Sequence, residues 1–137
     1  MFTKQKWRML VKGIIGLSLA AVLCTGCHSN KPAELSFNSK YVDLGIIYSD
    51  SAVRHVDFKF RNSGGKELII KDVKTDCDCT KAVFSHEAFN SGDEGVISVT
   101  LDLRAFFPQR VVKHVAVYSN TGINPDTLVI AGIIKNK

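Results

Sequence analysis

Four stretches of this chain have apolar residues that recur with a period of two. In the first, residues 56–61, Val and Phe alternate with Asp, Lys and Arg. The same alternation recurs at 97–103, and the period of two also appears at 111–118 and 128–134, where some of the intervening residues are apolar as well. Because successive side chains of a strand point to opposite faces, each stretch predicts a strand with one buried and one solvated face. Helical periodicity is not found over any stretch of ten or more residues.

The remaining segments predict further short strands and the turns between them. Briefer apolar runs predict strands at 35–37, 42–46, 68–73 and 81–84. Residues typical of turns separate the strands at 62–65, 90–93 and 119–126. Seven or eight short strands in about 100 residues indicate an all-β, immunoglobulin-like antiparallel sandwich over residues 35–137. An antibody-type domain is excluded, because the single Trp, Trp7, precedes the strands and no Cys–Trp–Cys core pattern exists.

The first 26 residues have the three parts of an export signal. A cationic head is followed by the uncharged run 13–23 and by the small-residue exit Cys24-Thr25-Gly26. The run is too short for a membrane-spanning helix, which needs about 20 apolar residues. Residues 1–26 are therefore predicted to be a signal peptide that is cleaved before Cys27.

The exit of this signal resembles that of bacterial lipoproteins, in which a Cys after small residues receives lipid and becomes the new N-terminus. Thr25-Gly26-Cys27 fits that pattern, whereas Cys24 stands where such signals usually have Leu. The resemblance implies lipid attachment at Cys27, with residues 27–34 as a tether. Two or more acyl chains hold a protein stably on a membrane, so we expect a domain anchored in the bacterial cell envelope, periplasmic or surface-facing. Its expected partner is an envelope protein or glycan.

Charge gives no support for nucleic-acid binding. The formal net charge is +5, but 4 of the 18 Lys and Arg residues lie in the predicted signal, which contains none of the 13 Asp and Glu residues. The 111 residues from Cys27 onward thus have 14 cations against 13 acids. No basic stripe interleaved with aromatic residues is present. No cofactor and no catalysis are expected either, because no serine stands in a Gly-x-Ser-x-Gly motif and no other reaction is recognisable.

Several motifs, in order and spacing, resemble the bacterial domain-of-unknown-function family 1573. Its members look like small exported lipoproteins with an immunoglobulin-like fold, common in Bacteroidota, and no activity is assigned to them. The most specific element is Cys77-Asp78-Cys79-Thr80, in which relatives usually have Gly at the position of Asp78. The other matching segments are Asp43-Leu44-Gly45-Ile46-Ile47, Phe58-Lys59-Phe60-Arg61-Asn62-Ser63-Gly64, Ser91-Gly92-Asp93-Glu94-Gly95, Ser119-Asn120 and Leu128-Val129-Ile130-Ala131-Gly132.

Cys77-Asp78-Cys79 is the one candidate for chemistry, and three interpretations remain open. The first is a local disulfide, which needs the chain to bend, because residues i and i+2 of a flat strand have Cα atoms about 6.6 Å apart. The second is a periplasmic thiol-redox or copper site, with His55, His86 and His114 as distant ligands; the flanking acids disfavour thiolates there. The third is a pair of packed thiols without a chemical role.

Two weaker patterns concern exposed loops. Asp50-Ser51-Ala52 and Asp126-Thr127-Leu128 resemble the Asp-Ser/Thr-apolar acceptor of O-glycosylation in Bacteroidota, so Ser51 and Thr127 are candidate modification sites in expected turns. Phe106-Phe107-Pro108 lies in an expected loop, where we predict that the aromatic pair covers one open end of the sandwich; the alternative is an exposed aromatic patch that contacts a partner.

Overall fold

A computed structural model of the chain describes residues 30–48, 53–104 and 106–136. The predicted signal peptide, the predicted lipid-attachment residue Cys27 and the candidate glycosylation residue Ser51 lie outside this part of the chain. The described residues form nine strands. They include no helix long and apolar enough to cross a membrane.

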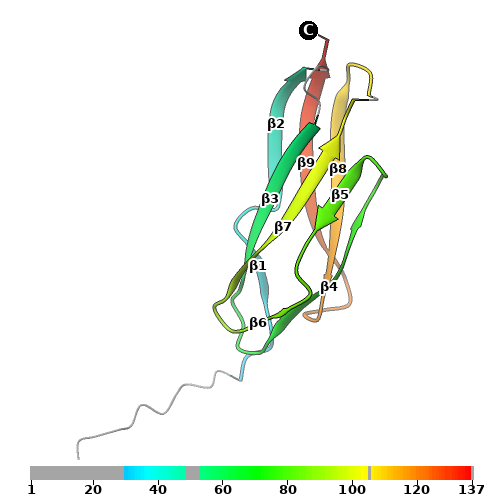
Figure 1. Ribbon diagram of the computed structural model, residues 1–137. Coiled ribbons are helices and arrows are strands. Elements are labelled where there is room, and N and C mark those ends of the chain that lie inside the picture. Colours follow the sequence, from blue (N-terminus) through cyan, green and yellow to red (C-terminus); the bar gives the residue numbers. More distant parts are fainter. Residues whose placement is uncertain (1–29, 49–52, 105, 137) are drawn as a thin grey trace, which may run out of the picture.

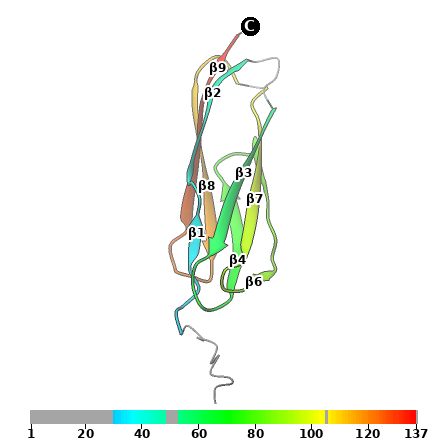
Figure 2. The same ribbon diagram turned by 90° about the vertical axis from the view of Figure 1, so that its left-hand side faces the viewer.

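The strands form two sheets that pack face to face (Figures 1 and 2). The four-stranded sheet has, in spatial order, β1 (Leu35–Phe37), β3 (Val53–Asn62), β7 (Glu94–Asp102) and β5 (Thr80–Val83). The five-stranded sheet has β2 (Tyr41–Tyr48), β9 (Asp126–Lys135), β8 (Arg110–Ser119), β4 (Leu68–Thr75) and β6 (Ala88–Phe89). Pairing is antiparallel except between β2 and β9. This arrangement is the immunoglobulin-like sandwich predicted from the sequence, with the first two strands divided between the sheets.

The core lies between the sheets and uses the faces that the period-two alternation predicts. In β7, Ile97, Val99 and Leu101 are almost fully buried, and β3 contributes Phe58 and Phe60 from the same sheet. The opposite sheet contributes inward side chains that are equally buried: Ile47, Leu68, Ile70, Val115, Val117, Leu128, Ile130 and Ile134. Interdigitation of these aliphatic and aromatic groups is the main stabilising contribution of the fold.

The chain enters the domain through a close contact with the β3–β4 loop. The backbone N–H of Gly65 donates to the carbonyl of Pro32 at 3.1 Å, and that of Ser63 donates to the carbonyl of Glu34 at 3.0 Å. A side chain at Gly64 would overlap the backbone between Pro32 and Glu34, so this position needs glycine. The last three residues of the predicted tether 27–34 are thus attached to the domain.

Two details differ from the predicted elements. The two-residue strand β6 was not expected, because so short a segment has no periodicity to read. Phe106 packs against the core as predicted, with the Lys113 ammonium 4.9 Å from its ring centroid, but Phe107 is 82% exposed. The prediction for Phe107 was wrong, because the turn closed by the hydrogen bond from the Phe106 N–H to the Leu103 carbonyl, at 3.0 Å, brings Phe106 to the core and leaves Phe107 outside it.

Candidate functional site

Cys77 and Cys79 are joined by a disulfide in the turn that connects β4 to β5. Their Cα atoms lie 5.2 Å apart, closer than i and i+2 residues of a flat strand. The turn provides the bend that a local disulfide requires, and it carries the chain from the five-stranded sheet to the four-stranded one. Of the three interpretations of Cys77-Asp78-Cys79, the structure therefore has the local disulfide.

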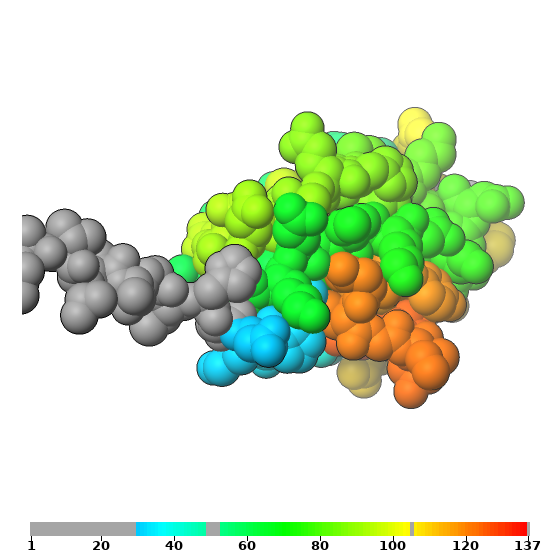
Figure 3. Space-filling view, turned by 90° about the horizontal axis from the view of Figure 1, so that it is seen from below, coloured from blue at the N-terminus to red at the C-terminus, as the bar shows by residue number. Residues whose placement is uncertain are grey.

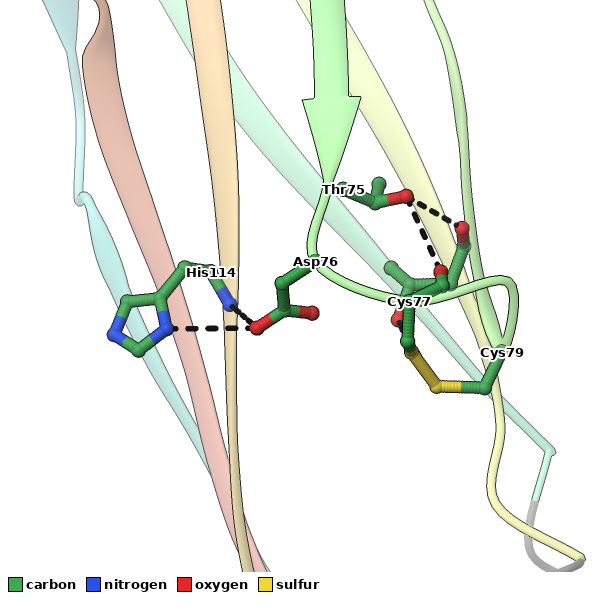
Figure 4. A network of polar contacts seen from close by, with 6 residues as sticks. Thr75, Asp76, Cys77, Cys79 and His114 are labelled. Carbon is green, nitrogen blue, oxygen red and sulfur yellow. Dashed lines mark hydrogen bonds and ion pairs between the residues drawn. A yellow bond between two sulfur atoms is a disulfide. The ribbon is translucent and has the colours of Figure 1, made fainter.

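Two threonines hold the backbone of this turn (Figure 4). The Thr75 hydroxyl donates to the carbonyls of Cys77 at 3.3 Å and Thr80 at 3.0 Å. The Thr80 backbone N–H donates to the carbonyl of Cys77 at 3.1 Å. The Thr80 side chain is buried, and its Oγ1 lies 3.4 Å from Sγ of Cys77 and 3.7 Å from Sγ of Cys79. One hydroxyl thus contacts both sulfur atoms.

Asp76 and Cys79 attach the turn to both sheets. Oδ2 of Asp76 accepts a hydrogen bond from the backbone N–H of His114 on β8 at 3.0 Å and lies 3.5 Å from Nδ1 of the same residue (Figure 4). On the other side, the carbonyl of Cys79 accepts from the backbone N–H of Asp102 on β7 at 2.8 Å. The disulfide turn is therefore fixed relative to the sandwich at both of its ends.

A hollow of about 650 Å³ borders the disulfide on the outer side of the four-stranded sheet. Cross-strand pairing brings its walls together, since Val53 on β3 pairs with Asp102, and Lys81 on β5 pairs with Thr100. The residues that line the hollow are Val53, Asp78, Cys79, Lys81, Thr100, Asp102 and Arg104. Sequence reasoning did not predict that Val53, Thr100, Asp102 and Arg104 lie beside Cys79, because these residues come from other segments, which reach the disulfide turn only through strand register.

Asp102 and Arg104, which both line the hollow, form an ion pair. Nε of Arg104 donates to Oδ1 of Asp102 at 2.9 Å, and its Nη2 donates to Oδ2 at 2.5 Å. These hydrogen bonds, together with one from the Arg104 backbone, lower the pKa of Asp102 to about 2, and the carboxylate raises the pKa of Arg104. The pair keeps a fixed guanidinium at the edge of the hollow.

The histidines weighed as distant ligands do not gather around the cysteines. His55 hydrogen-bonds Thr100 at 3.0 Å, His86 lies against the ring of Phe84, and His114 contacts Asp76. Among the described residues, no three His, Cys, Asp or Glu side chains are grouped to hold a metal ion. The structure therefore assembles no ligand set for the copper interpretation in this part of the chain.

Thr127, the described candidate for glycosylation, lies in a strand. It is the second residue of β9, pairs with Ala116 and is exposed. The expectation of a turn at this residue was wrong, because the pairing of β8 with β9 already begins at Asp126. Its modification stays a prediction.

A second feature of the surface is an apolar face on the outer side of β2, β9 and β8. We use the term apolar face for Tyr41, Ile46, Tyr48, Val112 and Ile133, which are 42–52% exposed. Ile46 pairs with Ile133, so their side chains are neighbours on the outer side of the sheet. The sequence already indicated an apolar outer face, since residues 128–134 are apolar at the outward positions as well as the inward ones.

Comparison with solved structures supports the fold alone. A protein of unknown function from Porphyromonas gingivalis W83 is 19% identical with a TM-score of 0.61, over 75% of this chain and 46% of that one. The ASH/PapD-like domain 7 of human CEP192 is 9% identical with a TM-score of 0.57, over 88% of this chain and 96% of that domain. The VesB protease of Vibrio cholerae is 12% identical with a TM-score of 0.54, over 77% of this chain and 32% of the protease. This chain thus spans less than half of the Porphyromonas and Vibrio proteins.

At the level of sequence, no curated protein matches the chain. One family does, described as "Protein of unknown function (DUF1573)", and the match extends over residues 35–134. It covers the sandwich from β1 to within one residue of the end of β9 and includes the disulfide turn. The chain belongs to the DUF1573 family.

Proposed function

We propose that this protein is an envelope lipoprotein, anchored through Cys27, whose immunoglobulin-like domain binds a partner protein on a surface that takes no part in catalysis. The apolar face is the observation on which the proposal depends. Large apolar side chains that are clustered and exposed are uncommon on monomers and mark interaction surfaces. Those of the apolar face lie on three adjacent strands of one rigid sheet, which suits a preformed binding surface.

The charges around the apolar face favour a different protein over a second copy of this chain. Arg110 pairs with Ile133 across the sheet, and Lys135 pairs with Tyr48. Neither cation has an ion pair within the described residues. Two copies facing each other would bring these like charges together, whereas a partner with apolar anchors and an acidic rim would complement them.

The free edge of β2 is poorly suited to extend the sheet into another molecule. Its pairing with β9 shifts register between Asp43 and Ile46, and Gly45 there has a φ of 63°. The Asp43 carboxylate accepts a hydrogen bond from the Gly45 N–H at 2.8 Å. A bulge of this kind protects a sheet edge from pairing. We therefore assign partner binding to the face of the sheet and not to its edge.

Position within the molecule agrees with a tethered role. The described chain starts at the end of the sandwich formed by β6 and the β3–β4 and β8–β9 loops, which Figure 3 shows from below. A tether at this end leaves the long sides of both sheets open to other molecules of the envelope.

Anchoring is tested by the Cys27→Ala variant, with Cys24→Ala as its matched control. Lipid attachment at Cys27 predicts that Cys27→Ala moves the protein from the membrane fraction to the soluble fraction, while Cys24→Ala stays with the membrane. A Cys27→Ala protein that still partitions into detergent would show that the anchor is wrong.

Binding by the apolar face is tested by Ile133→Lys, with Val96→Lys on the opposite sheet as the control. Both residues are about equally exposed, at 44% and 42%. A buried charge at an interface disrupts it, so Ile133→Lys should lose a partner that co-purifies with the detergent-solubilised wild type, and Val96→Lys should keep it. Equal retention by both variants would contradict the assignment.

A further inference from the structure

The Cys77–Cys79 disulfide is poorly placed to act as a structural staple. It joins residues only two positions apart, and closing so short a segment removes little conformational entropy from the unfolded chain. The domain already has a core contributed by both sheets. Both cysteines are partly exposed, and Cys79 lines the hollow. Accessible disulfides of this kind are the ones that undergo exchange.

We propose that the Cys77–Cys79 disulfide is a thiol–disulfide exchange site whose substrate is a dithiol of another envelope protein, with attack at Cys79 and departure of Cys77 as the thiolate. A substrate thiolate forms a bond to Sγ of Cys79 while the Cys77–Cys79 bond breaks. The second substrate thiol, after losing its proton, then attacks the mixed disulfide and releases Cys79. Two electrons and two protons pass from the dithiol, which becomes a disulfide, to the cysteines, which become thiols.

The direction of attack follows from the surroundings of the two sulfur atoms. Cys79 lines the hollow, through which a substrate can approach, and Cys77 does not. The Thr80 hydroxyl lies nearer to Sγ of Cys77, at 3.4 Å against 3.7 Å for Cys79. A buried hydroxyl that donates to the leaving sulfur stabilises it as a thiolate. Access and leaving-group stabilisation thus assign different roles to the two cysteines.

The charges of the hollow suit an incoming thiolate. Lys81 and Arg104 both line it, and Lys81 has no ion pair within the described residues. Of the acids nearby, Asp102 is paired with Arg104, and Asp76 contacts His114 on the side of β8. Asp78 is the remaining carboxylate of the hollow, so its lining has two cations and two acids, of which Asp102 is already paired.

The first test compares single-cysteine variants of the detergent-purified protein. Cys77→Ser leaves Cys79 free, and Cys79→Ser leaves Cys77 free. Oxidised glutathione is added, and mass spectrometry with peptide mapping follows the mixed disulfide at each position. At a pH high enough to ionise both thiols, the proposal predicts that Cys79 reacts at least about tenfold faster than Cys77, because Cys79 borders the hollow and Cys77 does not. Equal rates, or faster reaction of Cys77, would overturn the assigned direction.

The second test concerns Thr80 as a positioning residue. Thr80→Val keeps the volume but removes the hydroxyl, and Thr80→Ser keeps the hydroxyl. Equilibration of the wild type with glutathione buffers gives the ratio of dithiol to disulfide. Loss of a hydrogen bond to the thiolate should shift this ratio about tenfold toward the disulfide in Thr80→Val, while Thr80→Ser stays near the wild type. Identical ratios in the three proteins would overturn the role of Thr80.

A final measurement tests the site itself without any substitution. Dithiothreitol should reduce the disulfide of the native protein much faster than the protein unfolds, as measured by urea-induced unfolding kinetics under the same conditions. Reduction that occurs only at the rate of global unfolding would mean that the bond is inaccessible in the fold, and the exchange site would be rejected.

Discussion

At the scale of single residues, Asn62 connects the entry of the chain to two loops. Its side chain is fully buried, and its amide makes four hydrogen bonds. Oδ1 accepts from the backbone N–H groups of Glu34 and Gly64, and Nδ2 donates to the carbonyls of Lys66 and Phe89. The Asn62-Ser63-Gly64 motif is therefore explained by structure: it fixes the contact between the N-terminal segment and the β3–β4 loop.

Replacement of Asn62 by Ala should lower the free energy of unfolding by about 3 kcal/mol, because buried backbone groups would lose their partners. Asn120→Ala is a graded control, since the exposed amide of Asn120 makes two backbone hydrogen bonds, to Ile69 and Glu67. Loss of the Asn120 amide should lower the free energy of unfolding by about 1 kcal/mol. Urea denaturation of both variants measures which of them loses more unfolding free energy. An Asn62→Ala protein as stable as Asn120→Ala would contradict the account.

Asp102 should titrate far below a normal carboxyl group. Hydrogen bonds from Arg104 lower its pKa from 3.8 to about 2. A lowered pKa stabilises the folded state above the unfolded-state pKa, and this contribution is lost as the pH falls from about 4 to about 2. The pair is exposed, so the effect on stability is small and decreases with salt. NMR titration of the Asp102 carboxyl carbon should give this lowered pKa, and Arg104→Gln should return the pKa of Asp102 to the normal range. An unchanged pKa in that variant would show that Arg104 does not lower it.

At the scale of elements, the period-two alternation predicted the long strands and their buried faces. In β7 and β8 the expected inward residues, among them Ile97 and Val115, are those that the structure buries. The alternation failed at β6, whose two residues have no period, and it could not predict which strands would be neighbours. The hollow beside Cys79 depends on that pairing, whereas the disulfide and Thr80 were visible because they are contiguous in sequence.

Two adjacent residues of β9 test the assignment of faces. Ile133 points outward and is 44% exposed, whereas Ile134 points into the core and is 1% exposed. Ile134→Ala should therefore lower the free energy of unfolding by about 3 kcal/mol, through lost burial and a cavity. Ile133→Ala should change it by no more than about 1 kcal/mol. Urea denaturation distinguishes them, and similar losses in both variants would mean that the outer side of β9 is covered by something other than solvent.

At the scale of the whole molecule, the surface features lie on different sides of one rigid sandwich. The apolar face belongs to the outer side of the five-stranded sheet, and the hollow with Cys79 belongs to the outer side of the four-stranded sheet. A tether at the end near β6 would leave both sides accessible (Figure 1). Partner binding and thiol exchange can thus be disabled separately, by Ile133→Lys and by Cys79→Ser.

The most direct test of partner binding is photo-crosslinking in intact cells. A photoreactive residue is placed at Val112 on the apolar face and, as a control, at Val96 on the opposite sheet; both positions are 42% exposed. The account predicts a discrete adduct with another envelope protein from Val112 and none from Val96. Adducts of equal yield from both positions, or a Val112 adduct that consists of two copies of this chain, would contradict it.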